Sequence, residues 1–357
     1  MSESGMNILF FILGLVTLIG GAELLVRGAS RLSLSFGISP LVVGLTVVAF
    51  GTSAPEMAVS VQSAMTDRAD IALGNVIGSN IMNVLLILGA SAMIVPLVVA
   101  NQLIRQEVPV MVGFSLLLLA LSYDGKLSPL DGLLLIVLFL IYTVVVVRQS
   151  RRQLGAEAGS GAPSSVVGNG RGDHWTIQLL LVGSGLGLLV LGAHWLVGAA
   201  VAFANHLGIS ELVIGLTVVA VGTSLPEVAT SLMAAFRGER DIAGVLGVTS
   251  LVAPTGIPVH LSILSFDLPV MIAVAVACLP IFFTGNLIAR WEGGLFLSLY
   301  AAYLAYVVLA AQKHDALTAY GSVLAGFVLP IIAVTLILVS WREWHVLAST
   351  RRTGVRK

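Results

Sequence analysis

The sequence predicts an all-α, polytopic membrane protein of two inverted five-helix repeats plus an extra C-terminal helix, with about 11 transmembrane segments. Three observations predict this class: the composition, the recurrence of long apolar stretches and an internal duplication. Of the 357 residues, 57% are hydrophobic and 10% are charged, whereas soluble domains carry roughly 25% charged residues. The lipid bilayer is therefore the expected surroundings of the chain. The formal net charge of +0 indicates no nucleic-acid partner, and no protein partner is indicated.

Apolar stretches of spanning length recur along the chain. We expect spans near 7–27, 39–65, 71–99, 107–123, 128–147, 176–204, 210–235, 242–264, 268–288, 293–311 and 320–341. No basic n-region or A-x-A cleavage site accompanies the first stretch, so we expect a retained span rather than a signal peptide. The one sizeable polar interruption, 148–175, is rich in Gly and Ser, contains Pro163 and is predicted to be a flexible linker.

The duplication is nearly exact in one segment. Residues 37–56 read GISPLVVGLTVVAFGTSAPE and residues 208–227 read GISELVIGLTVVAVGTSLPE, with four differences. The predicted domains are a first repeat (1–147), the linker (148–175), a second repeat (176–311) and an extra helix with a basic tail (312–357). Because each repeat has five spans, the second copy enters the membrane upside down, which is typical of secondary transporters.

The distribution of Lys and Arg predicts the orientation of the chain. If the loops alternate between the two sides, 15 of these residues fall on the side of the linker and 3 on the opposite side. The positive-inside rule then places the N-terminus outside and the linker and C-terminus in the cytoplasm. The expected location is the plasma (inner) membrane, crossed many times.

The duplicated segments end in a motif that breaks a helix and supplies oxygen atoms. Pro55 cannot donate a backbone hydrogen bond, and its ring clashes with the carbonyl of Gly51. Broken helices survive in lipid only where they line a polar cavity. The motifs supply side-chain oxygens from Thr52, Ser53 and Glu56 in the first half and from Thr223, Ser224 and Glu227 in the second.

Two carboxylates with several neutral oxygens form a site for a hard cation. Ca²⁺ takes six to eight oxygen ligands, and two carboxylates balance one Ca²⁺ or about two Na⁺. Without a metal the carboxylates repel each other and hold protons, so H⁺ competes. Alternatively, each Glu faces water at the membrane surface and each Pro marks an ordinary kink. Two copies in register on inverted halves favour the functional interpretation.

A second polar segment follows the first motif. In GNVIGSNIMN, residues 74–83, Ser79 and Asn83 are four residues apart and share one helix face. We interpret these two as cation ligands, and Asn75 and Asn80 as packing or backbone support. No nucleotide-binding or zinc-protease motif and no nucleophile–base pair is visible, so an enzyme and a cofactor are not expected.

Together these motifs resemble the sodium/calcium exchanger family of the cation/calcium exchanger superfamily, over nearly all of residues 7–311. The resemblance implies ten spans in two inverted repeats and exchange of Ca²⁺ for Na⁺ by alternating access. It also implies a set of ion ligands: Thr52, Ser53, Glu56, Ser79, Asn83, Thr223, Ser224 and Glu227.

The second half departs from this pattern after Asp241. A gapped alignment leaves out about thirteen residues, those matching 73–85, and sets Val245-Leu246-Gly247 opposite Ile87-Leu88-Gly89. An ungapped alignment would set Ser250 opposite Ser79 and Pro254 opposite Asn83. We prefer the gapped alignment, and in both the partner of Asn83 is lost.

The sequence therefore supports several hypotheses. The leading one is a secondary antiporter that exchanges Ca²⁺ for Na⁺, either fully active or impaired by the missing segment. The alternatives are a degenerate, non-transporting membrane paralogue, a cation/proton exchanger and a passive cation leak.

Overall fold

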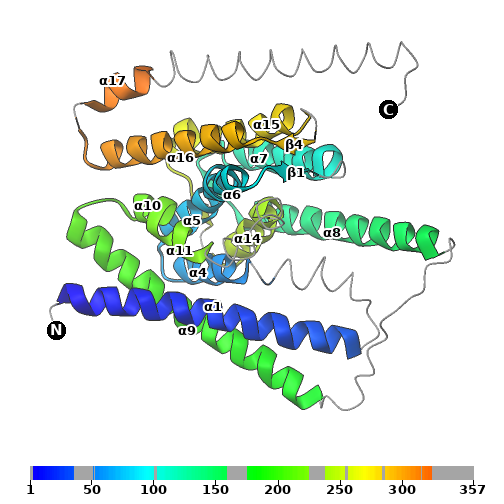
Figure 1. The fold of residues 1–357 in the computed structure, drawn as a ribbon. Helices are drawn as coiled ribbons and strands as arrows, with labels where there is room; N and C mark the ends of the chain where they lie inside the picture. The colour runs from blue at the N-terminus through cyan, green and yellow to red at the C-terminus, as the bar shows by residue number, and fades with distance from the viewer. Residues whose placement is uncertain are drawn as a thin grey trace, which may run out of the picture. The chain divides into compact units, whose positions relative to one another are not determined.

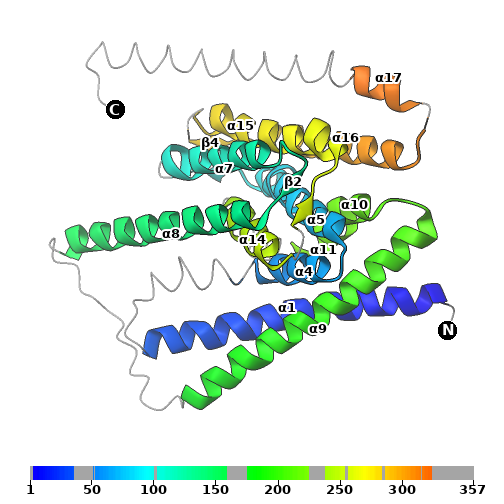
Figure 2. The same ribbon diagram turned by 180° about the vertical axis from the view of Figure 1, so that it is seen from behind.

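The protein is nearly all helical in a computed structural model, which describes residues 3–35, 51, 53–99, 103–158, 175–224, 238–253, 256–283, 286–314 and 316–323. Within these residues, α-helices and short π-helical turns are accompanied by four strands of two residues each. The prediction of an all-α fold is confirmed. Figures 1 and 2 show the helices from opposite sides.

The chain forms two compact units, and neither corresponds to one sequence repeat. Unit 1 comprises Met1–Val76, Lys126–Ala229 and Arg240–Pro258, and unit 2 comprises Ile77–Gly125, Thr230–Glu239 and Val259–Lys357. Each unit therefore takes segments from both halves of the sequence.

Two long helices of unit 1, α1 (Glu3–Ser35) and α9 (Trp175–Leu207), cross in close contact (Figure 1). A Cβ at Gly14 would lie 2.9 Å from the backbone nitrogen of Leu196, and a Cβ at Gly185 would lie 2.6 Å from that of Leu25. Small residues permit such backbone contact in membranes. The two contacts are equivalent under the 171-residue offset between the duplicated segments, so α1 and α9 are repeat-related partners.

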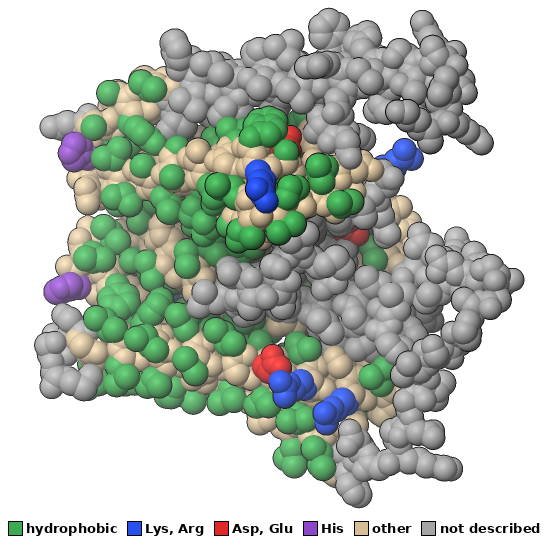
Figure 3. Space-filling model, viewed as in Figure 1, with side chains coloured by type: hydrophobic (Ala, Val, Ile, Leu, Met, Phe, Trp, Pro, Cys, Tyr) green, Lys and Arg blue, Asp and Glu red, His purple; other side chains and the backbone are tan. Residues whose placement is uncertain are grey.

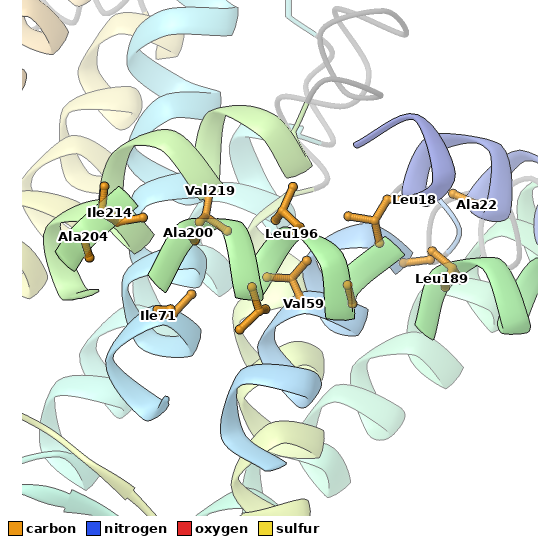
Figure 4. Packing of buried hydrophobic residues seen from close by; sticks show 13 residues of the cluster. Leu18, Ala22, Val59, Ile71, Leu189, Leu196, Ala200, Ala204, Ile214 and Val219 are labelled. Carbon is orange, nitrogen blue, oxygen red and sulfur yellow. The ribbon is translucent and has the colours of Figure 1, made fainter. Parts of the chain in front are cut away.

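Shorter helices of unit 1 pack against this pair. They are α4 (Ala54–Met65), α5 (Ala69–Met82), α10 (Glu211–Ile214), the π-turn η4 (Gly215–Val219) and α11 (Ala220–Thr223). Helix α5 continues across the boundary into unit 2. Figure 4 shows the buried apolar cluster that joins α1, α4, α5, α9, α10 and η4, with Leu18 from α1, Leu196 from α9 and Val59 from α4. This cluster supports the chain segments that carry the two motifs.

Unit 1 also contains α8 (Pro129–Ala158), α14 (Gly238–Val252), and the strands β2 (Lys126–Leu127) and β3 (Ile257–Pro258), which pair with each other. Helix α8 begins where Asp131 accepts hydrogen bonds from the backbone nitrogen and the hydroxyl of Ser128. Such an acceptor satisfies N–H groups that a helix start leaves open.

Unit 2 starts within α5 and continues through repeat-related elements of both halves. From the first half come the π-turn η2 (Asn83–Leu88), α6 (Gly89–Ile94), β1 (Leu97–Val98), the π-turn η3 (Leu103–Glu107) and α7 (Val108–Leu121). From the second half come the π-turn η5 (Ile263–Asp267), α15 (Leu268–Phe283), β4 (Leu287–Ile288), α16 (Arg290–Ala311) and α17 (Ala316–Val323). Strand β1 pairs with β4. Each of the two strand pairs thus joins the two halves of the sequence.

Two glycine contacts show which residues of the shortened repeat are equivalent. In unit 1, a Cβ at Gly132 would lie 2.7 Å from the carbonyl oxygen of Gly247. In unit 2, a Cβ at Gly293 would lie 2.6 Å from the carbonyl oxygen of Gly89. Gly132 and Gly293 start corresponding helices, so Gly247 corresponds to Gly89. This is the equivalence that the gapped alignment requires, and it leaves α14 without counterparts for the residues around Ser79.

Seven described helices are long and apolar enough to cross a membrane. They are Gly5–Ser35, Ala69–Ile94, Ile104–Leu121, Pro129–Gln149, Trp175–Leu207, Ile263–Phe282 and Arg290–Ala311. Hydrophobic side chains cover much of the described surface in Figure 3, over α1 and α9 among others. The prediction of a polytopic membrane protein is therefore confirmed.

Within the predicted span at 242–264, the described helix covers only the first part. Helix α14 has 15 residues, about 22 Å of helix, whereas the hydrocarbon core is about 30 Å thick. It ends at Val252 before Gly256, whose φ of +78° is incompatible with helix. The predicted spans at 39–65, 210–235 and 320–341, and the linker, lie in part outside the described residues.

Candidate cation site

The first motif lies at the start of α4. Ser53 is the residue before the helix, and Pro55 occupies its first turn, where a missing N–H costs no intrahelical hydrogen bond. Glu56 follows in the same turn and is 5% exposed. The helix start thus holds a buried carboxylate at the first motif.

The second motif meets the first at this carboxylate. Helix α11 ends at Thr223, and the hydroxyl of Ser224 donates a hydrogen bond of 3.1 Å to Glu56 Oε1. Thr223 and Ser224 are fully buried. The two copies of the duplicated segment therefore contact each other within unit 1, through a hydroxyl of one and the carboxylate of the other.

Asn75 on α5 bonds to both motifs. Its Nδ2 donates to the backbone oxygen of Glu56 at 3.3 Å and to Ser60 Oγ at 3.1 Å. Its Oδ1 accepts a hydrogen bond of 2.9 Å from the hydroxyl of Thr223. The amide is fully buried and holds the start of α4 beside the end of α11.

A glycine crossing brings Asn75 to this position. A Cβ at Gly74 would lie 2.7 Å from the carbonyl oxygen of Leu212, and a Cβ at Gly215 would lie 2.9 Å from that of Ile71. Helix α5 thus packs backbone to backbone against α10 and η4. Larger residues would separate α5 from the segment that ends in Thr223 and Ser224.

Ser79 and Asn83 follow Asn75 at intervals of four residues, Ser79 on α5 and Asn83 at the first position of η2. Both belong to unit 2 and are buried, with exposed fractions of 4% and 3%. Ser79 Oγ and Asn83 Oδ1 have no hydrogen-bond partner within the described part of the chain. Buried oxygens without partners are costly, and a cation is one ligand that would satisfy them.

The structure thus places four of the eight candidate ligands, Ser53, Glu56, Thr223 and Ser224, in unit 1, and brings Glu56 and Ser224 into contact. Ser79 and Asn83 are in unit 2, and Thr52 and Glu227 lie outside the described residues. The sequence reasoning missed the bond from Thr223 to Asn75. From the sequence, Asn75 is assigned only to packing or backbone support, and no local pattern indicates Thr223 as its partner.

Comparison with known proteins shows which family this chain belongs to. The family profile described as "Sodium/calcium exchanger protein" matches residues 6–148 and 177–309, which is more than half of the chain. The chain belongs to the sodium/calcium exchanger family. The two matched segments flank the predicted linker, and each carries one of the two motifs.

Curated relatives of this exchanger-family protein include archaeal and bacterial membrane proteins. It is 30% identical over 345 residues to "Sodium/calcium exchanger MaX1" of Methanosarcina acetivorans, covering 84% of this chain and 97% of the relative. This chain is also 38% identical over 254 residues to "Inner membrane protein YrbG" of Escherichia coli, a match that covers 69% of this chain and 77% of the relative.

A solved structure supports the fold. The sodium-calcium exchanger NCX_Mj, soaked with Na⁺ and Sr²⁺, aligns with a TM-score of 0.56 and 32% sequence identity. The alignment covers 85% of this chain and 99% of that one. The predicted membership of an ion-transporting family, rather than an enzyme family, is consistent with these matches.

Proposed function

We propose that this protein exchanges Ca²⁺ for Na⁺ across the plasma membrane by alternating access. The observation that carries the proposal is the hydrogen bond between Ser224 and Glu56, because it joins the two motifs at one buried carboxylate. A carboxylate with neutral oxygens around it suits Ca²⁺ and Na⁺. The name of the relative MaX1 and that of NCX_Mj agree with these ions.

The proposed ligand set is that of the family motifs: Thr52, Ser53, Glu56, Ser79, Asn83, Thr223, Ser224 and Glu227. Within it, the carboxylates supply the charge that compensates the cation. The hydroxyl and amide oxygens replace its water. Asn75 acts as a positioning residue, because its amide already bonds to Thr223, Ser60 and the backbone of Glu56.

We further propose that the N-terminus lies outside, with the linker and C-terminus in the cytoplasm. The excess of Lys and Arg on the linker side supports this orientation. Single cysteines introduced into the linker and near the N-terminus, probed in intact cells with a membrane-impermeant maleimide, test it. Labelling of the N-terminal cysteine alone is expected, and labelling of the linker would reverse the orientation.

The test of exchange uses purified protein in proteoliposomes loaded with Na⁺ or with choline. We expect ⁴⁵Ca²⁺ uptake that requires internal Na⁺ and that Glu56→Gln abolishes. The matched control is Glu23→Gln on α1, which removes a glutamate whose side chain is 59% exposed. Uptake without internal Na⁺ would indicate a leak, or a proton exchanger if a pH gradient drives it. No uptake from folded protein would favour a non-transporting paralogue.

A further inference from the structure

A buried carboxylate in unit 2, that of Asp267, lies apart from both motifs. Asp267 ends the π-turn η5 and is 5% exposed. Its Oδ1 accepts a hydrogen bond of 3.0 Å from the hydroxyl of Tyr303 on α16. An acidic residue in a membrane span is a functional candidate by default, because its burial is costly.

The same pair of residue types occurs in both repeats. Asp267 lies 160 residues after Glu107, the separation that also relates Leu97 of β1 to Ile257 of β3. Tyr303 lies 161 residues after Tyr142, the separation that relates Gly132 to Gly293. Glu107 ends the π-turn η3 as Asp267 ends η5, and it is also buried. Duplication has therefore kept an acid and a tyrosine at matching places.

The surroundings of Asp267 favour a proton over a metal as its ligand. Among the described residues, no Lys, Arg or His forms an ion pair with Asp267, and no group of three or more His, Cys, Asp or Glu residues could hold a metal ion. The titratable groups on the surrounding elements are Arg290, Glu292, Tyr300, Tyr303 and Tyr306 on α16, Cys278 on α15, and Arg105 and Glu107 on η3, which packs on α15. One carboxylate and a phenol are too few oxygens for Ca²⁺, whereas a proton needs one.

The pair is connected to the segment that carries Asn83. Phe266, beside Asp267, stacks on Tyr306 of α16 with ring centroids 3.7 Å apart. One buried stripe of α16 carries Phe296, Tyr300 and Tyr303, and Phe296 contacts the position of Gly89 at the start of α6. Both α15 and α16 pack against η2, the turn that begins at Asn83. A change at the Asp267–Tyr303 bond therefore reaches η2 through contacts within unit 2.

We propose that Asp267 and Tyr303 form a proton-binding site, separate from the motif carboxylates, that regulates cation affinity through η2. When Asp267 is ionised, the hydrogen bond from Tyr303 is charge-assisted and about twice as strong as a neutral one. This bond holds η5 against α16 and keeps Asn83 in place. Protonation weakens the bond, loosens η2 and lowers the affinity for Ca²⁺. The regulatory part rests on the proposed exchange function.

The experiment compares apparent KM values for Ca²⁺ in Na⁺-loaded proteoliposomes from about pH 5 to about pH 8. Asp267→Asn mimics the protonated acid, so the ratio of its KM to that of the wild type is expected to be about tenfold at the alkaline end and to approach one at the acid end. Taking the ratio cancels proton competition at Glu56, which both proteins share. Tyr303→Phe removes the other partner of the hydrogen bond, so the ratio of its KM to that of the wild type is also expected to exceed one at the alkaline end. The control His260→Gln, at an exposed histidine before η5, leaves the ratio near one.

A ratio that stays constant with pH, or stays at one, would overturn the regulatory role. Infrared difference spectroscopy tests the proton site without transport. On acidification the wild type should show a carbonyl band of protonated carboxylic acids, and the component that Asp267 contributes to this band should be missing in Asp267→Asn. Identical bands in the two proteins would show that Asp267 takes up no proton. If the wild type shows no flux, the exchange proposal fails, and the infrared result still decides the proton site.

Discussion

Ser224 donates its hydroxyl hydrogen to Glu56 across 3.1 Å, joining a residue of the second repeat to the carboxylate of the first. Because both partners are buried, the bond forms away from bulk water, where a hydrogen bond to a charged acceptor contributes about 1.5–3 kcal/mol. The oxygen of the same hydroxyl group can also coordinate a bound cation. The contact therefore identifies Ser224 as the residue whose removal should most directly report on the proposed site.

Replacing this hydroxyl should weaken Ca²⁺ binding. We expect Ser224→Ala to raise the apparent KM for Ca²⁺ at least about tenfold, since 1.4 kcal/mol corresponds to tenfold. Initial rates of ⁴⁵Ca²⁺ uptake over a range of concentrations measure it. Ser298→Ala is the control, because Ser298 is exposed and its hydroxyl bonds only to the backbone of Gly294 among the described residues. Equal KM values in the two variants would exclude Ser224 from the site.

Removing the Asn75 amide should destabilise the protein. Asn75→Ala leaves the buried hydroxyl of Ser60 without its Asn75 donor, which costs about 1–3 kcal/mol for an unsatisfied group, whereas the hydroxyl of Thr223 keeps its bonds to the backbone oxygens of Val219 and Ala220. We expect a lower Tm in detergent, measured by thermal unfolding. Gln312→Ala, just after the end of α16, serves as the control. An unchanged Tm for Asn75→Ala would show that the network contributes nothing to stability.

A larger residue in the glycine contact between α8 and α14 should also destabilise the protein. In Gly132→Ala the new methyl group would lie 2.7 Å from the Gly247 carbonyl oxygen and 2.8 Å from Ser250 Cβ, so a helix must shift. Overpacking of this kind costs about 1–3 kcal/mol. The control is Gly187→Ala on α9, which meets no atom within 4 Å among the described residues and should be neutral or stabilising, because Ala is the better helix former. If both variants unfold at the same temperature, the contact is not tight.

With the shortened second repeat, we expect exchange of about two Na⁺ for each Ca²⁺. Helix α14 lacks counterparts of Ser79 and Asn83, so oxygens are missing on one side of the proposed site. Two carboxylates then balance one Ca²⁺ or about two Na⁺, and exchange of that kind moves no net charge. We expect ⁴⁵Ca²⁺ uptake to be unaffected by a K⁺ diffusion potential set with valinomycin. Uptake that accelerates when the interior is made positive would show that more than two Na⁺ leave per Ca²⁺.

Much of the helical framework could be predicted from the sequence. Hydropathy located the seven described spans, and Pro55 located the start of α4. The end of α14 at Val252, followed by Gly256 in a left-handed conformation, could not be predicted, because average hydropathy does not register it. Single-sequence patterns count apolar residues, and a polar backbone turn inside an apolar stretch leaves the count unchanged.

The contacts between distant segments could not be predicted in this way. The bond from Thr223 to Asn75 depends on the approach of Gly74 to Leu212, which no local pattern encodes. The Asp267–Tyr303 bond joins residues 36 positions apart, on η5 and α16. Periodicity places each residue on its own helix, but the identity of the facing helix is a property of the tertiary fold.

The pairing of β1 with β4, and of β2 with β3, bears on the origin of the chain. Leu97 pairs with Ile288, and Leu127 pairs with Ile257. Each of the two strands in one half of the sequence therefore pairs with a strand of the other half. Reciprocal exchange of identical elements is the hallmark of a two-fold symmetric homodimer. Gene duplication and fusion of a dimer-forming ancestor would leave this arrangement, with the former subunit interface now running through the interior of a single polypeptide.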